Sequence, residues 1–130
     1  MSAPANDLAG PREWLNRARS SLEHARATHP KVYFEELCFD AQQAAEKAVK
    51  AVLLGKGIAF PYVHDLDALL RLLATSGEPL AGAVIRAGEL RRYPGLPGHV
   101  SEQEYREALA LAESVVQWAE TVLLSTEKQA

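Results

Sequence analysis

The chain has 130 residues, of which 48% are apolar and 24% are charged, and its net charge is −3. This length predicts one domain, the composition excludes disorder as the main state, and the charge excludes a uniformly polyanion-binding chain. Alanine (22) and leucine (18) far outnumber valine, isoleucine and threonine (15 together). This balance favours helices over sheets, because β-branched side chains lose rotamer freedom in a helix.

Cysteine usage and apolar runs indicate the compartment. The single cysteine, Cys38, excludes an intrachain disulfide, and nothing suggests secretion. No apolar run approaches the roughly 18 residues that span a bilayer, and residues 1–7 have neither a basic start nor a long apolar stretch. We therefore expect a cytoplasmic protein without a membrane segment.

The first predicted helix starts at Pro11, since proline is favoured at the first helical position. Apolar residues then recur at steps of three or four (Trp14, Ala18, Leu22 and Ala25). Pro30 is predicted to open the second helix, which is expected to be the longest. Its apolar stripe is rich in alanine (Phe34, Leu37, Ala41, Ala44, Ala48 and Val52), so neighbouring helices are expected to approach it closely.

Gly55 and Gly57 are expected to end this helix. Asp65 is predicted to cap a short Leu-rich helix, and a second short helix runs from Leu80 to the basic pair at 91–92. A capping box at 101–104 then opens the last helix, which is acidic where the first is basic. The predicted fold is all-α: an up-and-down helical bundle of three long and two short helices over 10–126, between tails at 1–9 and 127–130.

The second helix carries a polar side with two interpretations. Its members are Gln43, Glu46, Lys47 and Lys50. One interpretation is a solvated face held by the neighbour pairs Gln43–Lys47 and Glu46–Lys50. The other is a partner or ligand surface, where Lys47 and Lys50 add affinity for phosphate. Spacing alone does not choose between them.

A second cluster precedes the last helix and consists of Arg91, Arg92, Tyr93 and His99. Arginine holds phosphate through two hydrogen bonds, histidine transfers protons near pH 7, and tyrosine stacks on bases. Together they suit metal-free RNA cleavage, in which histidine deprotonates a 2′-hydroxyl and arginine stabilises the phosphoryl charge. The alternative is that the arginines end a helix, Tyr93 packs and His99 lies in a solvated loop.

Other chemistry-bearing residues favour structural roles. Cys38 lies beside the apolar stripe, where a buried small side chain is expected rather than a nucleophile. His64 either titrates near a ligand or, as we favour, closes a loop. The four histidines lack metal-site spacing, and no glycine-rich phosphate loop is present, so neither a metal nor a cofactor is expected.

Residues 38–53 (CFDAQQAAEKAVKAVL) closely resemble the signature helix of the prokaryotic HEPN domain family, of the type associated with minimal nucleotidyltransferases. The rest follows the layout of that family over roughly 10–126. Matching features are the opening helix with Trp14, the His64-Asp65-Leu66 entry to a Leu-rich helix, the Arg92-Tyr93-Pro94 turn and the long closing helix.

The resemblance implies a helical bundle that is usually a homodimer. It also implies a nucleotidyltransferase-like partner, often in a toxin–antitoxin system. Many members are metal-independent ribonucleases with an arginine, four to six residues and a histidine, and Arg92 and His99 are separated by six residues. The Arg-Tyr-Pro form looks more like a branch that binds nucleotides or partners.

We therefore expect a binding module whose ligand groove contains Lys47, Lys50, Arg91, Arg92 and Tyr93. The alternatives are an endoribonuclease that uses Arg92 and His99 across a homodimer cleft, and an adaptor that binds only protein.

Overall fold

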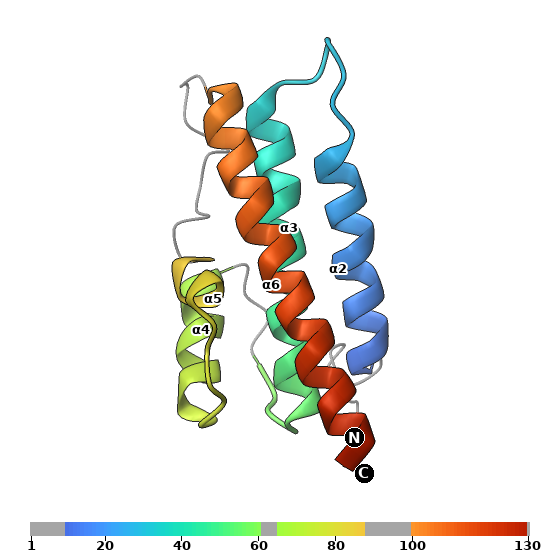
Figure 1. Ribbon diagram of the computed structural model, residues 1–130, viewed down its shortest axis with the longest axis vertical. Coiled ribbons are helices and arrows are strands. Elements are labelled where there is room, and N and C mark those ends of the chain that lie inside the picture. The colour runs from blue at the N-terminus through green and yellow to red at the C-terminus, as the bar shows by residue number, and fades with distance from the viewer. Residues whose placement is uncertain (1–9, 61–64, 88–99, 130) are drawn as a thin grey trace.

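The computed structural model describes residues 10–60, 65–87 and 100–129, and these ranges contain five helices and no strand. The helices are α2 (Pro11–Arg26), α3 (Phe34–Gly55), α4 (Leu66–Thr75), α5 (Gly82–Arg86) and α6 (Glu102–Gln129) (Figure 1). The predicted all-α bundle of three long and two short helices is confirmed. Within these ranges, no helix combines the length and the apolarity that crossing a bilayer requires.

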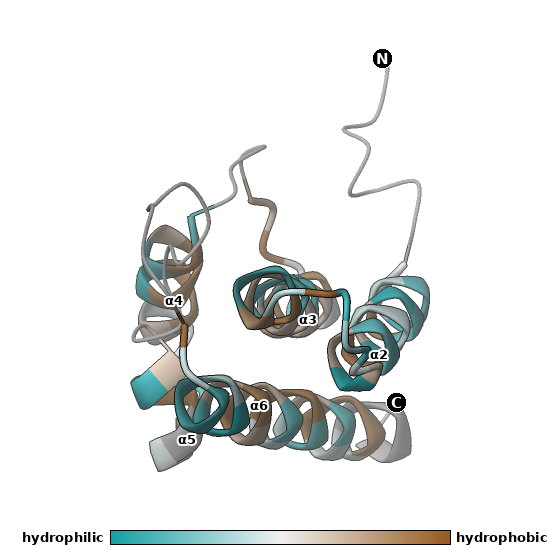
Figure 2. Cartoon of the chain, turned by 90° about the horizontal axis from the view of Figure 1, so that it is seen from above, coloured by the Kyte–Doolittle hydropathy of each residue, from teal (hydrophilic) through white to brown (hydrophobic). Residues whose placement is uncertain are grey.

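Helix α3 is the centre of the bundle. It packs against α2, α6 and α4, and in the view along the bundle α2 and α4 flank it while α6 lies across a third side (Figure 2). No described helix covers the fourth side of α3 in this view. The short helix α5 packs on α6 instead.

Alanines allow α3 to be enclosed in this way. Five alanines of α3 are fully buried (Ala41, Ala44, Ala45, Ala48 and Ala51). A methyl side chain leaves little between two helix backbones, so α2 and α6 approach without opening cavities. The predicted alanine-rich contact surface is confirmed.

The helix ends follow from local hydrogen bonding. Asp65 caps α4 by accepting from the backbone N–H of Ala68 at 3.3 Å, as predicted. The capping box at α6 is also confirmed, since Ser101 Oγ accepts from Glu104 N at 3.1 Å and Glu104 Oε1 accepts from Ser101 N at 3.0 Å. Helix α6 continues to Gln129, beyond the predicted domain end at 126.

The predicted start of α3 at Pro30 is wrong by four residues, because the helix begins at Phe34. Pro30 lies in a turn that the Val32 N–H closes on the carbonyl of His29 at 2.9 Å. The Lys31 N–H also donates to Nδ1 of His29 at 3.1 Å, which holds the chain outside helical geometry. The second short helix begins at Gly82 rather than at Leu80 and is described over Gly82–Arg86, while its predicted end at 91–92 lies outside the described ranges.

Two ion pairs cross between α2 and α6. Arg19 donates through Nε (2.8 Å) and Nη2 (2.6 Å) to Glu120, and Arg26 donates through Nε (2.9 Å) and Nη2 (2.7 Å) to Glu113. The two arginines are two helical turns apart on α2, and the two glutamates are two turns apart on α6. Both ion pairs therefore specify the same register between the antiparallel helices. Exposed pairs contribute little to stability individually, but two-pronged pairs specify orientation.

The alanine contact surface predicts a sharp response to added volume. We expect Ala48→Leu to lower the free energy of unfolding by about 1–3 kcal/mol, because three extra carbons must enter a filled interface. Urea denaturation measures the change. The matched control is Ala110→Leu on the exposed side of α6, for which a change within about 0.5 kcal/mol is expected. Equal stability of the two variants would contradict close packing at Ala48.

Candidate functional site

The polar side of α3, defined as Gln43, Glu46, Lys47 and Lys50, is largely withdrawn from solvent. Glu46 Oε1 accepts from Lys50 Nζ at 3.1 Å, and the two side chains are only 1% and 7% exposed. The predicted Glu46–Lys50 pair therefore exists, but its interpretation as part of a solvated face is wrong. The second predicted pair is absent, because Gln43 donates to Glu46 Oε2 at 3.5 Å and Lys47 bonds elsewhere.

Two aromatic rings cover the Lys50 ammonium. Its Nζ lies 5.2 Å from the ring centre of Trp14 and 5.4 Å from that of Phe60. The two rings meet edge to face, with centroids 6.0 Å apart. A cation over ring faces is stabilised by their negative potential, by about 2 kcal/mol when water is excluded. The aromatic pair and Glu46 together make a buried lysine tolerable.

Phe60 reaches this position because of how α3 ends. Gly57 has a φ of 73°, which only glycine adopts without strain. Its N–H donates to the carbonyl of Leu54 and the N–H of Ile58 to that of Leu53, both at 2.9 Å. These two hydrogen bonds reverse the chain direction at the end of the helix. Phe60 is thereby returned over the last turns of α3.

Lys47 points from α3 towards α2. Its Nζ donates to the hydroxyl oxygen of Ser21 at 2.8 Å, and the side chain is half-buried. Burial lowers the pKa of Lys47, and the charge of Arg17 lowers it further, while Glu46 and Asp40 act in the opposite direction. Lys47 is therefore a cation with an incomplete solvent shell beside a second cation.

Cys38 is buried in the core, as predicted. Burial, with a smaller contribution from the charge of Glu104, raises the pKa of its thiol to about 11. At neutral pH the group is therefore a thiol rather than a thiolate, and a thiol is a poor nucleophile.

Five residues considered in the sequence analysis lie outside the described ranges: His64, Arg91, Arg92, Tyr93 and His99. The structure therefore reports only the α3 part of the predicted groove. It adds three residues that the sequence analysis did not assign to this site: Trp14, Ser21 and Phe60. The inward position of Ser21 could have been predicted from the sequence, because this residue falls on the apolar stripe of α2.

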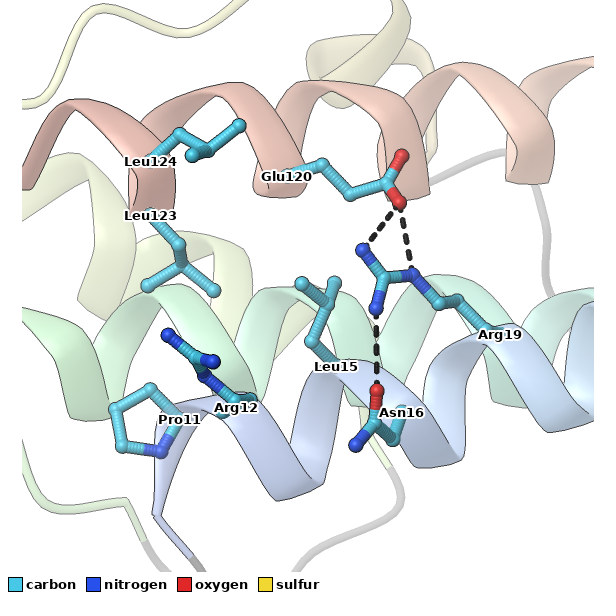
Figure 3. Close-up of a pocket in the computed structure, with 8 residues that line it drawn as sticks. All are labelled: Pro11, Arg12, Leu15, Asn16, Arg19, Glu120, Leu123 and Leu124. Atoms are coloured by element: carbon cyan, nitrogen blue, oxygen red, sulfur yellow. Dashed lines mark hydrogen bonds and ion pairs between the residues drawn. The ribbon is translucent and has the colours of Figure 1, made fainter. Parts of the chain in front are cut away.

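A surface pocket of about 380 Å³ lies elsewhere, between the start of α2 and the end of α6 (Figure 3). Leu15 and Leu123 form part of its wall, and the Arg19–Glu120 pair closes one end. None of the predicted site residues lines it. In the described part of the chain, no group of three or more His, Cys, Asp or Glu side chains is arranged to hold a metal ion.

The family model for the HEPN domain matches residues 11–122, which is most of the chain. The chain belongs to the HEPN domain family. The crystal structure of an archaeal HEPN homologue is similar to this domain, with a TM-score of 0.70 and 28% sequence identity, and the match covers 88% of this chain and 98% of the archaeal one. No curated protein matches the sequence.

The buried Glu46–Lys50 pair lies in the helix that carries the resemblance to the HEPN family. Glu46 and Lys50 both lie in residues 38–53, which form most of α3 of this HEPN domain. The segment that resembles the family therefore includes both the alanine surface, which packs the bundle, and the polar side, which forms the candidate site.

The buried pair predicts an unequal response to loss of charge. We expect Glu46→Gln to lower the free energy of unfolding by about 3–5 kcal/mol, because Lys50 keeps a buried charge without its carboxylate. Glu46→Gln combined with Lys50→Met is expected to recover part of the loss. Urea denaturation measures both.

The control for this prediction is Glu13→Gln, which breaks the exposed Glu13–Arg17 pair of 3.5 Å and is expected to change stability by less than about 1 kcal/mol. If Glu46→Gln were as mild as Glu13→Gln, the burial of the Glu46–Lys50 pair would be contradicted.

The raised pKa of Cys38 predicts slow alkylation in the folded state. At pH 8 a thiol with a pKa of about 11 instead of 9.0 has about one hundredth of the thiolate. We expect iodoacetamide to react at least a hundredfold more slowly than with an exposed cysteine. The reference is Ser20→Cys in a Cys38→Ala background, since Ser20 is exposed on α2; mass spectrometry follows both, and equal rates would refute burial of Cys38.

Proposed function

We propose that this HEPN domain is a binding module for nucleotides or RNA in the cytoplasm. In this proposal it forms a homodimer and acts with a minimal nucleotidyltransferase-like partner, as in a toxin–antitoxin-type two-component system. The observation that carries the proposal is the placement of Lys47. It is a half-buried cation at the contact between α3 and α2, where its Nζ donates to Ser21 Oγ at 2.8 Å, in a domain of the HEPN family.

The proposed ligand contacts are Lys47, Arg91, Arg92 and Tyr93. Lysine and arginine supply phosphate affinity, and tyrosine supplies a stacking surface for a base. Lys50 takes a supporting role, because its ammonium is buried and paired with Glu46. Lys47, which is half-buried, is the more accessible of the two lysines of α3.

The alternative is a metal-independent endoribonuclease that uses Arg92 and His99. The sequence observation that favours it is the spacing of six residues between them. In a homodimer, two such pairs would act in one cleft, with histidine as the base for a 2′-hydroxyl and arginine on the phosphate. A third candidate, an adaptor, would bind protein alone.

Measurements of oligomeric state and of nucleotide or RNA binding distinguish these candidate functions first. We expect the purified protein to elute as a dimer in size-exclusion chromatography with light scattering, and to retain labelled RNA or a nucleotide at low salt. Affinity should fall as salt rises, because phosphate contacts release counterions. Arg92→Ala should weaken binding about tenfold, as expected when one charged hydrogen bond is lost.

Cleavage then tests the alternative. Incubation of the protein with RNA in EDTA is expected to leave the RNA intact. Fragments with cyclic phosphate ends that disappear in both Arg92→Ala and His99→Ala would instead establish the ribonuclease. A monomer that retains neither nucleotide nor RNA would refute the proposed function and favour the adaptor.

A further inference from the structure

An aromatic side chain in the first half of α3 is left exposed. The exposed large apolar side chains of the described ranges are Tyr33, Phe39, Ile85 and Leu124, and Phe39 is the one that lies on α3. Its exposed fraction is 42%. A helix turns by about 100° per residue, so Phe39 points away from Ala48, which is fully buried. Phe39 therefore lies on the side of α3 opposite the alanine contact surface.

Two acids and two amides flank Phe39 along the helix. Glu35 and Glu36 lie one turn before it, and Gln42 and Gln43 lie one turn after it. Residues three and four positions apart share a helix surface, so these five residues form one surface, the Phe39 face. In the part of the chain that the structure describes, the side chains of Glu35, Glu36 and Gln42 have no hydrogen bond or ion pair. Gln43 uses one of its two amide N–H groups, at 3.5 Å from a carboxylate of its own helix.

The order of these groups along α3 is self-complementary. Carboxylates accept hydrogen bonds, and the side-chain amides can donate them. If two copies of α3 run antiparallel about a two-fold axis through Phe39, Glu35 of one copy lies opposite Gln43 of the other, and Glu36 lies opposite Gln42. Each match occurs twice, because a two-fold interface uses the same surface on both copies. A parallel arrangement would instead bring the acids of the two copies together.

We propose that the Phe39 face of α3 binds a second copy of this chain in this antiparallel arrangement. The two Phe39 rings meet at the axis and exclude water, as the central aromatic residues of interfaces do. Four hydrogen bonds between amides and carboxylates surround them and fix the orientation. A basic protein partner would satisfy the acids and leave the amides without acceptors, whereas a second copy satisfies both. The homodimer itself rests on the proposed function, and the inference adds its surface and register.

Light scattering over a dilution series tests the aromatic contact. We expect Phe39→Lys to weaken the dimer by about thirtyfold or more, because it removes the central rings and places two cations at the axis. The matched control is Ile85→Lys, since Ile85 is 64% exposed on α5, and its dimer should be as tight as that of the unmodified protein. Thermal unfolding confirms that both variants are folded. An unchanged dimer in Phe39→Lys would overturn the inference.

Substitutions at Gln42 test the polar contacts in both directions. Gln42→Glu should weaken the dimer, because it places a second acid opposite Glu36 of the other copy. Gln42→Lys should tighten the dimer, because it gives Glu36 an opposite charge. A general loss of stability would shift both variants in the same direction, so shifts of the same sign would contradict the proposed contact.

Mixed disulfide formation tests the register in a Cys38→Ala background. We expect an oxidised mixture of Glu36→Cys and Gln42→Cys proteins to form covalent dimers in non-reducing electrophoresis. Either protein alone should form few, because two copies of position 36 lie about 9 Å apart along the helices, beyond the reach of a disulfide. The control mixture is Ser20→Cys with Glu107→Cys, both on exposed positions of other helices. Equal yields in the two mixtures would refute the antiparallel register.

These measurements distinguish failure of the surface from failure of the proposed function. A dimer that persists in Phe39→Lys and gives no mixed disulfide refutes the Phe39 face, while the homodimer of the proposed function stands. A monomeric unmodified protein overturns the inference, and its retention of RNA or a nucleotide then decides the binding role separately. A monomer that binds a basic protein through Phe39 would assign the face to that other occupant and also overturn the inference.

Discussion

The structure depends on how closely α2 and α6 approach α3. Alanine is the residue that permits this approach at little conformational cost, since it is the best helix former and leaves the smallest gap between backbones. With helices on three sides of α3 (Figure 2), nearly all of its apolar surface is used for packing. No described helix covers the remaining side of α3 in this view.

The burial of Glu46 and Lys50 follows from that geometry. The helix end at Gly57 returns Phe60 over Lys50, and Trp14 approaches from α2. A charge enclosed in this way requires a partner, because desolvation of an ion without one costs several kcal/mol. The carboxylate of Glu46, one turn earlier on the same helix, supplies it. The pair is thus a consequence of covering this part of the polar side, while the neighbouring Lys47 is directed towards Ser21 of α2.

The bundle was predictable because its signals are local. Helical periodicity, the Asp65 cap and the capping box at 101–104 depend on residues within one or two turns, and each was confirmed. The start of α3 was not predictable, because the His29 turn competes with proline as a helix opener. The burial of Lys50 was equally hidden, since it requires an aromatic ring from α2 and another from beyond Gly57. The residues at 88–99 lie outside the described ranges, so that half of the predicted groove stays a prediction.

The small net charge of the chain does not show that the arginines of α2 have different surroundings on different sides of the helix. Arg19 and Arg26 point towards α6, where Glu120 and Glu113 neutralise them. Arg17 lies about halfway around the helix from Arg19, by the 100° rotation per residue, and its charge acts on Lys47. On that second side, the charge of Arg17 is shared with Glu13, whose carboxylate lies 3.5 Å from Arg17 Nε. Glu113 and Glu120 of the acidic last helix are therefore committed to the side of α2 that is opposite Arg17.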